Sequence, residues 1–167
     1  MLGANDSAEG QVPAHEFQLN LVAICTSLHQ LLPSAKLLLV TPPPINNQVW
    51  PTSTGNRGHG GSRSLERLKP YVEAMRKAVQ TVGAPARLLD LQHDFTTRLM
   101  HWADTVHDGF HLSTKGNVFV YRQIGEALRD AGLNPSQLPP KRPPALAAAV
   151  DMLDDGDGRY VKAQRKK

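Results

Sequence analysis

The strongest constraint on the fold is a short apolar run, Leu37 to Val40 within the segment 36–41, which three consecutive prolines follow at once. All four side chains are apolar, and a strand with no polar face is typical of the centre of a parallel sheet. Proline cannot donate to a sheet ladder, so residues 42–44 end this strand. Residues 87–91 contain a second short apolar run, and we expect a second buried strand there.

Helical periodicity surrounds these two runs. We expect helices over residues 13–32, over 65–82 with Ser64 as N-cap and Gly83 as terminator, and from a Ser113 cap to Gly132. Strands alternating with helices predict a parallel α/β layer fold. The expected apolar faces of the three helices are, in order, Phe17, Leu21, Ile24, Leu28 and Leu31; Tyr71, Met75, Ala78 and Val82; and Val118, Tyr121, Ile124 and Leu128.

Length and charge narrow the class of protein. The chain has 167 residues, enough for one domain, and a net charge of +4 that is concentrated after Arg159. A short basic end is more often solvated than bound to nucleic acid, and we predict no nucleic-acid partner. The lone Cys25 excludes an internal disulfide and lies in an apolar helical pattern, which indicates a buried thiol. With no membrane span and no signal peptide in the sequence, we expect a cytoplasmic location.

The chemistry of the chain centres on Asp108-Gly109-Phe110-His111. Gly109 makes a sharp turn inexpensive, and such a turn brings the carboxylate close to the imidazole. A carboxylate next to a histidine fixes its tautomer and stabilises the imidazolium that forms when the histidine removes a proton. A solvated turn with a surface histidine has the same spacing, so the pattern by itself leaves both interpretations open.

A second block favours the catalytic interpretation. Gly3-Ala-Asn5-Asp6-Ser7 opens the chain, and Asp108-Gly-Phe-His111-Leu-Ser lies near the end of the periodic region. Together they resemble the SGNH (GDSL-type) hydrolases, and within that family most closely the isoamyl acetate-hydrolysing esterases. The resemblance covers roughly residues 1–132. It implies a flavodoxin-like, doubly wound parallel sheet, a short-acyl ester substrate and a Ser-His-Asp mechanism, hence a place in lipid metabolism.

The resemblance also assigns roles to residues. It makes His111 the base, Asp108 its orienting partner and Asn5 an oxyanion donor. The family's nucleophile lies in an N-terminal Gly-Asp-Ser block, which this sequence does not contain. We therefore expect an N-terminally incomplete hydrolase domain over residues 1–133, with an unknown nucleophile, Ser7 being the first candidate. A non-catalytic, partner-binding remnant stays open as the alternative, as does an oligomer.

We predict neither a metal nor a cofactor. His107 and His111 have a zinc-like spacing, but Gly109 breaks the helix that this spacing requires and no third ligand is evident. The glycine-rich segment 55–61 lacks the Gly-Lys-Ser/Thr of a phosphate-binding loop, and a calcium loop begun at Asp155 fails at its glycine and closing glutamate positions. Trp50, in the polar stretch 45–63, is interpreted either as a pocket wall or as a lone surface anchor. Residues 134–167 read as a proline-rich linker followed by an acidic and then a basic tail.

Overall fold

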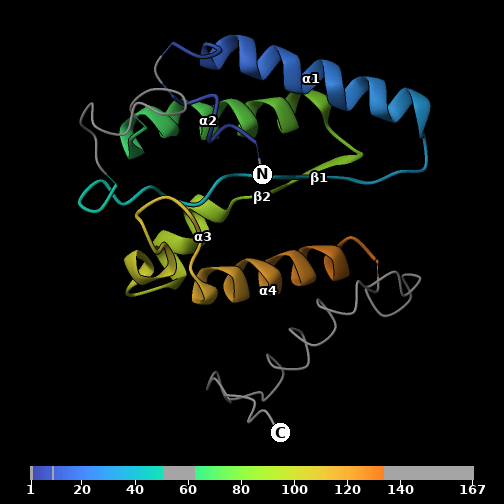
Figure 1. Ribbon diagram of the computed structural model, residues 1–167. Coiled ribbons are helices and arrows are strands. Elements are labelled where there is room, and N and C mark those ends of the chain that lie inside the picture. The colour runs from blue at the N-terminus through green and yellow to red at the C-terminus, as the bar shows by residue number, and fades with distance from the viewer. Residues whose placement is uncertain (1, 9, 51–62, 134–167) are drawn as a thin grey trace, which may run out of the picture. The chain divides into compact units, whose positions relative to one another are not determined.

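The computed structural model (Figure 1) describes residues 2–8, 10–50 and 63–133. The chain divides into two compact units, residues 1–127 and 128–167. Its elements are α1 (Ala14–Leu31), β1 (Leu37–Val40), α2 (Leu65–Val82), β2 (Ala86–Leu89), α3 (Leu91–Arg98), the 3-10 helix η2 (Trp102–Thr105) and α4 (Thr114–Asp130). The glycine-rich segment, the Asp155 motif and the basic tail lie outside the described residues, and the boundary at residue 133 stays a prediction.

The two strands are parallel, as the sequence predicted. β1 pairs with β2 in the register Leu37 to Ala86 and Val40 to Leu89. In Figure 1, α1 and α2 lie on one face of this pair, and α3 and α4 lie on the other. Both faces of β1 are therefore covered, which explains why the run contains no polar residue. The α/β class is confirmed.

Alternate residues of the strands enter two separate cores. Leu39 and Leu88 pack against a cluster of α1 and α2 residues that are almost fully buried: Phe17, Leu21, Ala74, Met75 and Ala78. Leu38 and Val40 pack on the opposite side, against a cluster made of Leu89, Leu91, Phe95 and Val120. The two-residue period of a strand accounts for this division.

The start and end signals of the helices are confirmed. The Ser64 hydroxyl accepts the Arg67 N–H at 3.2 Å, and Gly83 ends α2 with a φ of 66°. The Ser113 hydroxyl likewise accepts the Gly116 N–H at 3.3 Å at the start of α4. The sequence could predict these helix ends because each cap depends on residues that are close in sequence.

Two of the expected apolar faces are partly wrong. On α1, the buried stripe is Phe17, Leu21 and Cys25, whereas Ile24 is 51% exposed, and Leu28 and Leu31 are exposed as well. On α4, Val120 is buried and its neighbour Tyr121 is 53% exposed. In α2 the prediction is right for Met75 and Ala78, while Tyr71 and Val82 are only half-buried. Apolar periodicity identified the helices, but it did not reveal which apolar side chains receive a covering partner.

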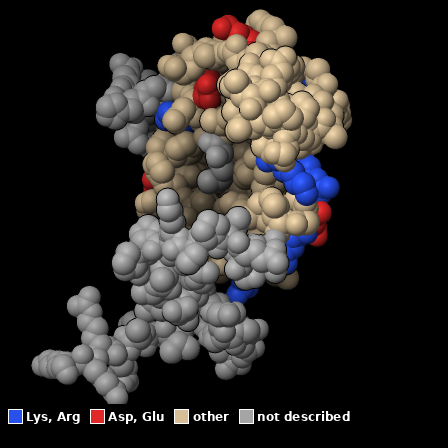
Figure 2. Space-filling view, turned by 90° about the vertical axis from the view of Figure 1, so that its right-hand side faces the viewer, with Lys and Arg blue, Asp and Glu red and all other residues tan. Residues whose placement is uncertain are grey.

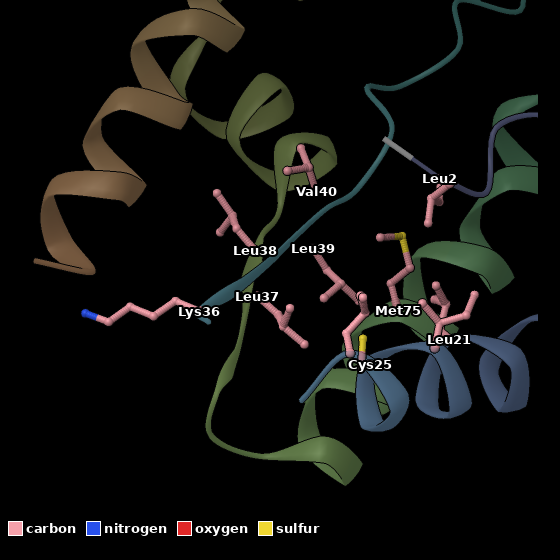
Figure 3. Close-up of a pocket in the computed structure, with 11 residues that line it drawn as sticks. Leu2, Leu21, Cys25, Lys36, Leu37, Leu38, Leu39, Val40 and Met75 are labelled. Carbon is pink, nitrogen blue, oxygen red and sulfur yellow. The ribbon is translucent and has the colours of Figure 1, made fainter. Parts of the chain in front are cut away.

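The uncovered side of α1 borders a groove. Among the described residues β1 pairs with β2 alone, and along β1 lies a cavity of about 280 Å³. Figure 3 shows Leu37 and Leu39 directed toward it, with Leu2 facing them from the start of the chain. The rest of its lining comes from β1, α1 and α2 and is apolar, including Leu21, Cys25 and Met75, except for Lys36 just before β1. An apolar groove beside an open strand edge is suited to receive a further extended segment.

Uncharged surface continues at the end of α1. In Figure 2, which shows the side where α1 ends and β1 begins, the described residues are mostly uncharged, and Lys and Arg gather mainly at one margin. Leu31 is 76% exposed and Leu32 is exposed too.

No helix within the described part of the chain is long and apolar enough to cross a membrane.

Candidate active site

The loop between η2 and α4 holds Asp108 and His111 in direct contact. The Nδ1 atom of His111 lies 2.6 Å from Oδ2 of Asp108. Oδ1 of the same carboxylate accepts the backbone N–H groups of His111 at 2.7 Å and Phe110 at 2.9 Å. Both carboxylate oxygens are thus used inside one turn, which fixes the rotamer of Asp108 and places it beside the imidazole.

Electrostatics keep this carboxylate ionised at neutral pH. Partial burial by itself raises the pKa of Asp108, but hydrogen bonds from the His111 ring and from the N–H groups of His111 and Phe110 outweigh it. They lower the pKa of Asp108 from 3.8 to about 2. An ionised Asp108 is an acceptor only, so Nδ1 of His111 carries the proton and donates it. In the neutral form of the imidazole, Nε2 is the nitrogen without a hydrogen, and that form can accept a proton from an attacking group there.

The pair is accessible from solvent. The side chain of His111 is 61% exposed and that of Asp108 is 35% exposed. A solvent-accessible imidazole that is oriented by a carboxylate at one ring nitrogen is the arrangement required for proton transfer to or from a bound molecule at the other. A surface turn with a solvated histidine does not require three hydrogen bonds to one carboxylate, so the geometry favours the catalytic interpretation.

Gly109 is pressed against the segment that follows β1. Its φ is 87°, and a Cβ at this position would lie 2.4 Å from the backbone nitrogen of Trp50 and 2.8 Å from the backbone carbonyl oxygen of Asn46. The Asn46 N–H donates to the Gly109 carbonyl at 2.8 Å. Only glycine combines a positive φ with this close approach. The chain leaving the carboxyl end of β1 therefore holds the Asp-His loop in place.

Trp50 is a wall of the site and not a lone surface anchor. Its ring centroid lies 4.9 Å from that of Phe110 and 6.1 Å from that of His111, the latter edge-on. Phe110 in turn packs on the buried Ile45, Leu68 and Val72. These aromatic rings support the imidazole on one side, so the segment 46–50 contributes to the candidate site as well as to the loop's stability.

Asn5 lies in a tight turn at the start of the chain and reaches the Asp-His loop through Arg63. Oδ1 of Asn5 accepts a hydrogen bond from Nη2 of Arg63 at 3.1 Å, and Nε of Arg63 donates to the Ala4 carbonyl at 3.2 Å. The same guanidinium lies 5.2 Å above the ring of Phe110. Arg63 therefore links the turn of Asn5 to the loop that holds Asp108 and His111, and the roles of these three residues stay a prediction. Arg63 was not singled out from the sequence, and nothing in its local pattern marks it.

Ser7 is not arranged as a nucleophile. Its side chain is almost fully buried, and the hydroxyl donates its one hydrogen to the Ala4 carbonyl at 2.9 Å. Asp6 closes the same turn by accepting the Gly3 N–H at 3.1 Å. Asp6 and Ser7, the two residues that follow Asn5, therefore stabilise the turn. The contacts of Ser7 are structural, and they do not support a role as the nucleophile.

His107 and Cys25 are the remaining candidates. His107 lies beside His111, with Nδ1 3.2 Å from the His111 carbonyl oxygen, but no group of three or more His, Cys, Asp or Glu side chains in the described ranges is arranged to hold a metal ion. Cys25 is buried, as predicted, and desolvation raises the pKa of its thiol. A raised pKa disfavours the reactive thiolate.

Comparison with known proteins now decides the family. The sequence profile of the GDSL-like lipase/acylhydrolase family matches residues 1–118, a stretch that contains both Asn5 and the Asp-His loop. The chain belongs to this family. The Asp108–His111 contact thus lies in the segment shared with the family.

Individual relatives agree with this membership. The chain is 32% identical to an isoamyl acetate-hydrolyzing esterase 1 homolog of Bos taurus over 93% of its own length and 65% of the relative's. It is 27% identical to a GDSL esterase/lipase of Arabidopsis thaliana over 93% of its length and 64% of that protein. The chain therefore spans about two thirds of the length of the relatives that it matches.

Solved structures support the fold. The crystal structure of a lipase/acylhydrolase from Enterococcus faecalis superposes with a TM-score of 0.59 at 22% identity, covering 84% of this chain and 62% of that one. A peptidoglycan O-acetylesterase structure gives a TM-score of 0.52 at 16% identity, with 34% of its chain covered. At these identities the likeness concerns the fold alone. Within this fold, the Asp-His loop of the present chain lies beside the segment that leaves the carboxyl end of β1.

Proposed function

We propose that this chain carries the base, its orienting carboxylate and one oxyanion donor of a carboxylic ester hydrolase that acts on short-acyl esters. The observation that carries the proposal is the Asp108–His111 contact at 2.6 Å, in a family whose relatives are named as esterases and lipases. In this mechanism, Nε2 of His111 removes a hydroxyl proton as that oxygen attacks the ester carbonyl. Asp108 stabilises the resulting imidazolium, and the Asn5 amide donates to the oxyanion.

We further propose that the attacking serine belongs to a segment outside these 167 residues. The sequence contains no Gly-Asp-Ser, and the hydroxyl of Ser7 is committed to the Ala4 carbonyl. The groove along β1 gives such a segment a place: an added parallel strand there would pair with the open edge and cover Leu37, Leu39 and Met75 (Figure 3). The two strands would then be part of a larger doubly wound, flavodoxin-like sheet.

The experiment supplies the proposed segment. A Gly-Asp-Ser-containing segment of the kind that the family carries is fused ahead of Leu2, the product is treated with a fluorophosphonate ester, and its intact mass is measured. We expect one adduct per molecule and hydrolysis of p-nitrophenyl acetate. The 167-residue chain alone should give neither.

Variants of the fused protein identify the base. His111→Ala should lower turnover by about 10³-fold or more, because a triad member is lost. His93→Ala is the matched control, since His93 is an exposed histidine on α3, outside the candidate site. An adduct that forms equally well without His111, or a folded fusion that takes no adduct, would contradict the proposal.

The groove also favours the second candidate function. The groove and the exposed side chains of Ile24 and Leu28 beside it form an apolar surface, and this surface is equally suited to a protein partner. A partner-binding, non-catalytic chain would form a stable complex through this groove, and its fused form would give no ester turnover. The fusion experiment therefore separates the two functions. A cytoplasmic location stays a prediction in either case.

A further inference from the structure

Arg63 connects two parts of the candidate site that are far apart in sequence. Through Nε and Nη2 it donates to the Ala4 carbonyl and to Oδ1 of Asn5, at 3.2 Å and 3.1 Å. Its Cζ atom also lies 5.2 Å from the centre of the Phe110 ring. Phe110 is the residue immediately before His111, and its N–H is bonded to Asp108. One guanidinium thus contacts both the asparagine turn and the loop of the base.

The chemistry of the two side chains fixes the direction of the Asn5 amide. A guanidinium has five N–H donors and no acceptor, so it can face only the oxygen of an amide. With Oδ1 held by Arg63, the NH₂ group of Asn5 must point to the opposite side. An unheld amide can rotate by half a turn and exchange its donor for an acceptor. Exchanged, it would present an oxygen to a developing oxyanion and repel it.

We propose that Arg63 is a positioning residue that holds the Asn5 amide with its donor side free for an oxyanion and couples that amide to the His111 loop. The inference rests on the proposed function for the meaning of the donor, but its geometric part concerns this chain alone. Preorganised donors contribute most to oxyanion stabilisation because they need no reorientation during the reaction. Through Arg63, a residue that does not touch the substrate determines whether Asn5 is such a donor.

The test is a nuclear magnetic resonance measurement on the 167-residue chain, using the side-chain NH₂ resonances of Asn5. In the parent we expect a rigid amide, with an order parameter near that of the backbone, about 0.85. Arg63→Gln and Arg63→Lys should both lower it to about 0.6 or less, since neither substitute supplies two parallel donors together with ring stacking. Arg122→Gln, which removes an exposed arginine of α4, should leave it unchanged.

The backbone spectrum shows whether each variant is folded, and Arg63→Lys keeps the charge if Arg63→Gln does not fold. An Asn5 amide that is equally rigid in the folded Arg63→Lys variant would overturn the inference. In the fused protein the same substitutions should lower kcat about 10-fold or more while KM changes by less than about 2-fold, because the bound ester carries no oxyanion until the hydroxyl attacks. An increase in KM at constant kcat would overturn the catalytic meaning of the contact. Loss of turnover in every fused form, with the resonances behaving as expected, would instead contradict the proposed function.

Discussion

The two blocks that hold the candidate catalytic residues are built in different ways. His111 is oriented by Asp108, three residues away, and the two N–H bonds to the same carboxylate come from its own turn. Asn5 also lies in a closed turn, but its amide is oriented by Arg63, which is 58 residues away. A locally specified residue is fixed as soon as its turn forms, whereas a residue specified at long range depends on the packing of the whole domain. We expect substitutions in the two blocks to differ accordingly.

The largest effect is expected where the Asp-His turn meets the rest of the domain. Gly109→Ala should destabilise the protein by about 2–4 kcal/mol, because the alanine would need a positive φ and its Cβ would lie 2.4 Å from the backbone nitrogen of Trp50. Urea unfolding followed by circular dichroism measures the free energy.

Gly10→Ala is the matched control for this strain. Gly10 has a φ of 76°, yet nothing lies within 4 Å of the added Cβ, so we expect a loss of about 1 kcal/mol. Equal losses in the two variants would show that the contact with the segment 46–50 contributes nothing, and the loop would then be specified by its own turn alone.

The next effect separates the charge of Asp108 from its shape. Asp108→Asn keeps the size of the side chain but removes the ionic acceptor. We expect a loss of about 1–2 kcal/mol at pH 7, reduced from a fully buried pair because Asp108 is 35% exposed. The folded-state pKa of about 2 is below the usual 3.8, so this stabilisation is complete above about pH 4 and is lost as the pH falls through 2.

Unfolding midpoints at pH 7, 4.5, 3 and 2.5 should therefore show the parent and Asp108→Asn converging in acid. Asp104→Asn changes an exposed carboxylate in the same region and should stay within about 0.5 kcal/mol of the parent at each pH. A parent-to-variant difference that is constant with pH would mean that Asp108 stabilises the turn by shape alone.

A smaller effect tests how Arg63 is held. Ser64 follows it directly and caps α2 through the Arg67 N–H, so Ser64→Ala should cost about 1 kcal/mol and loosen the start of the helix. Ser27→Ala, at an exposed position inside α1, should be neutral or slightly stabilising. If the Asn5 amide keeps its rigidity in Ser64→Ala, the cap and the Arg63 contact are independent.

The same difference between local and long-range specification explains what the sequence could predict. Period, capping and turn signals extend over a few residues, and they identified both strands, the Ser64 and Ser113 caps and the Asp108–His111 contact. The contacts of Arg63, the position of Trp50 and the uncovered Ile24 and Leu28 depend on which elements meet in space. Periodicity placed Ile24 and Leu28 on the apolar face of a helix, but whether a neighbour covers them depends on which elements pack against that side of α1.

The smallest effect concerns the only serine of the asparagine block. Ser7→Ala should cost about 0.5–1 kcal/mol, at the low end for a buried hydrogen bond, because the Ala4 carbonyl also accepts from Arg63 and keeps a partner. Its decisive measurement is the fluorophosphonate mass of the fused protein, which we expect to be the same with and without Ser7. Loss of the adduct in Ser7→Ala would show that this hydroxyl leaves the Ala4 carbonyl and attacks the ester, and the nucleophile would then belong to the turn that carries Asn5.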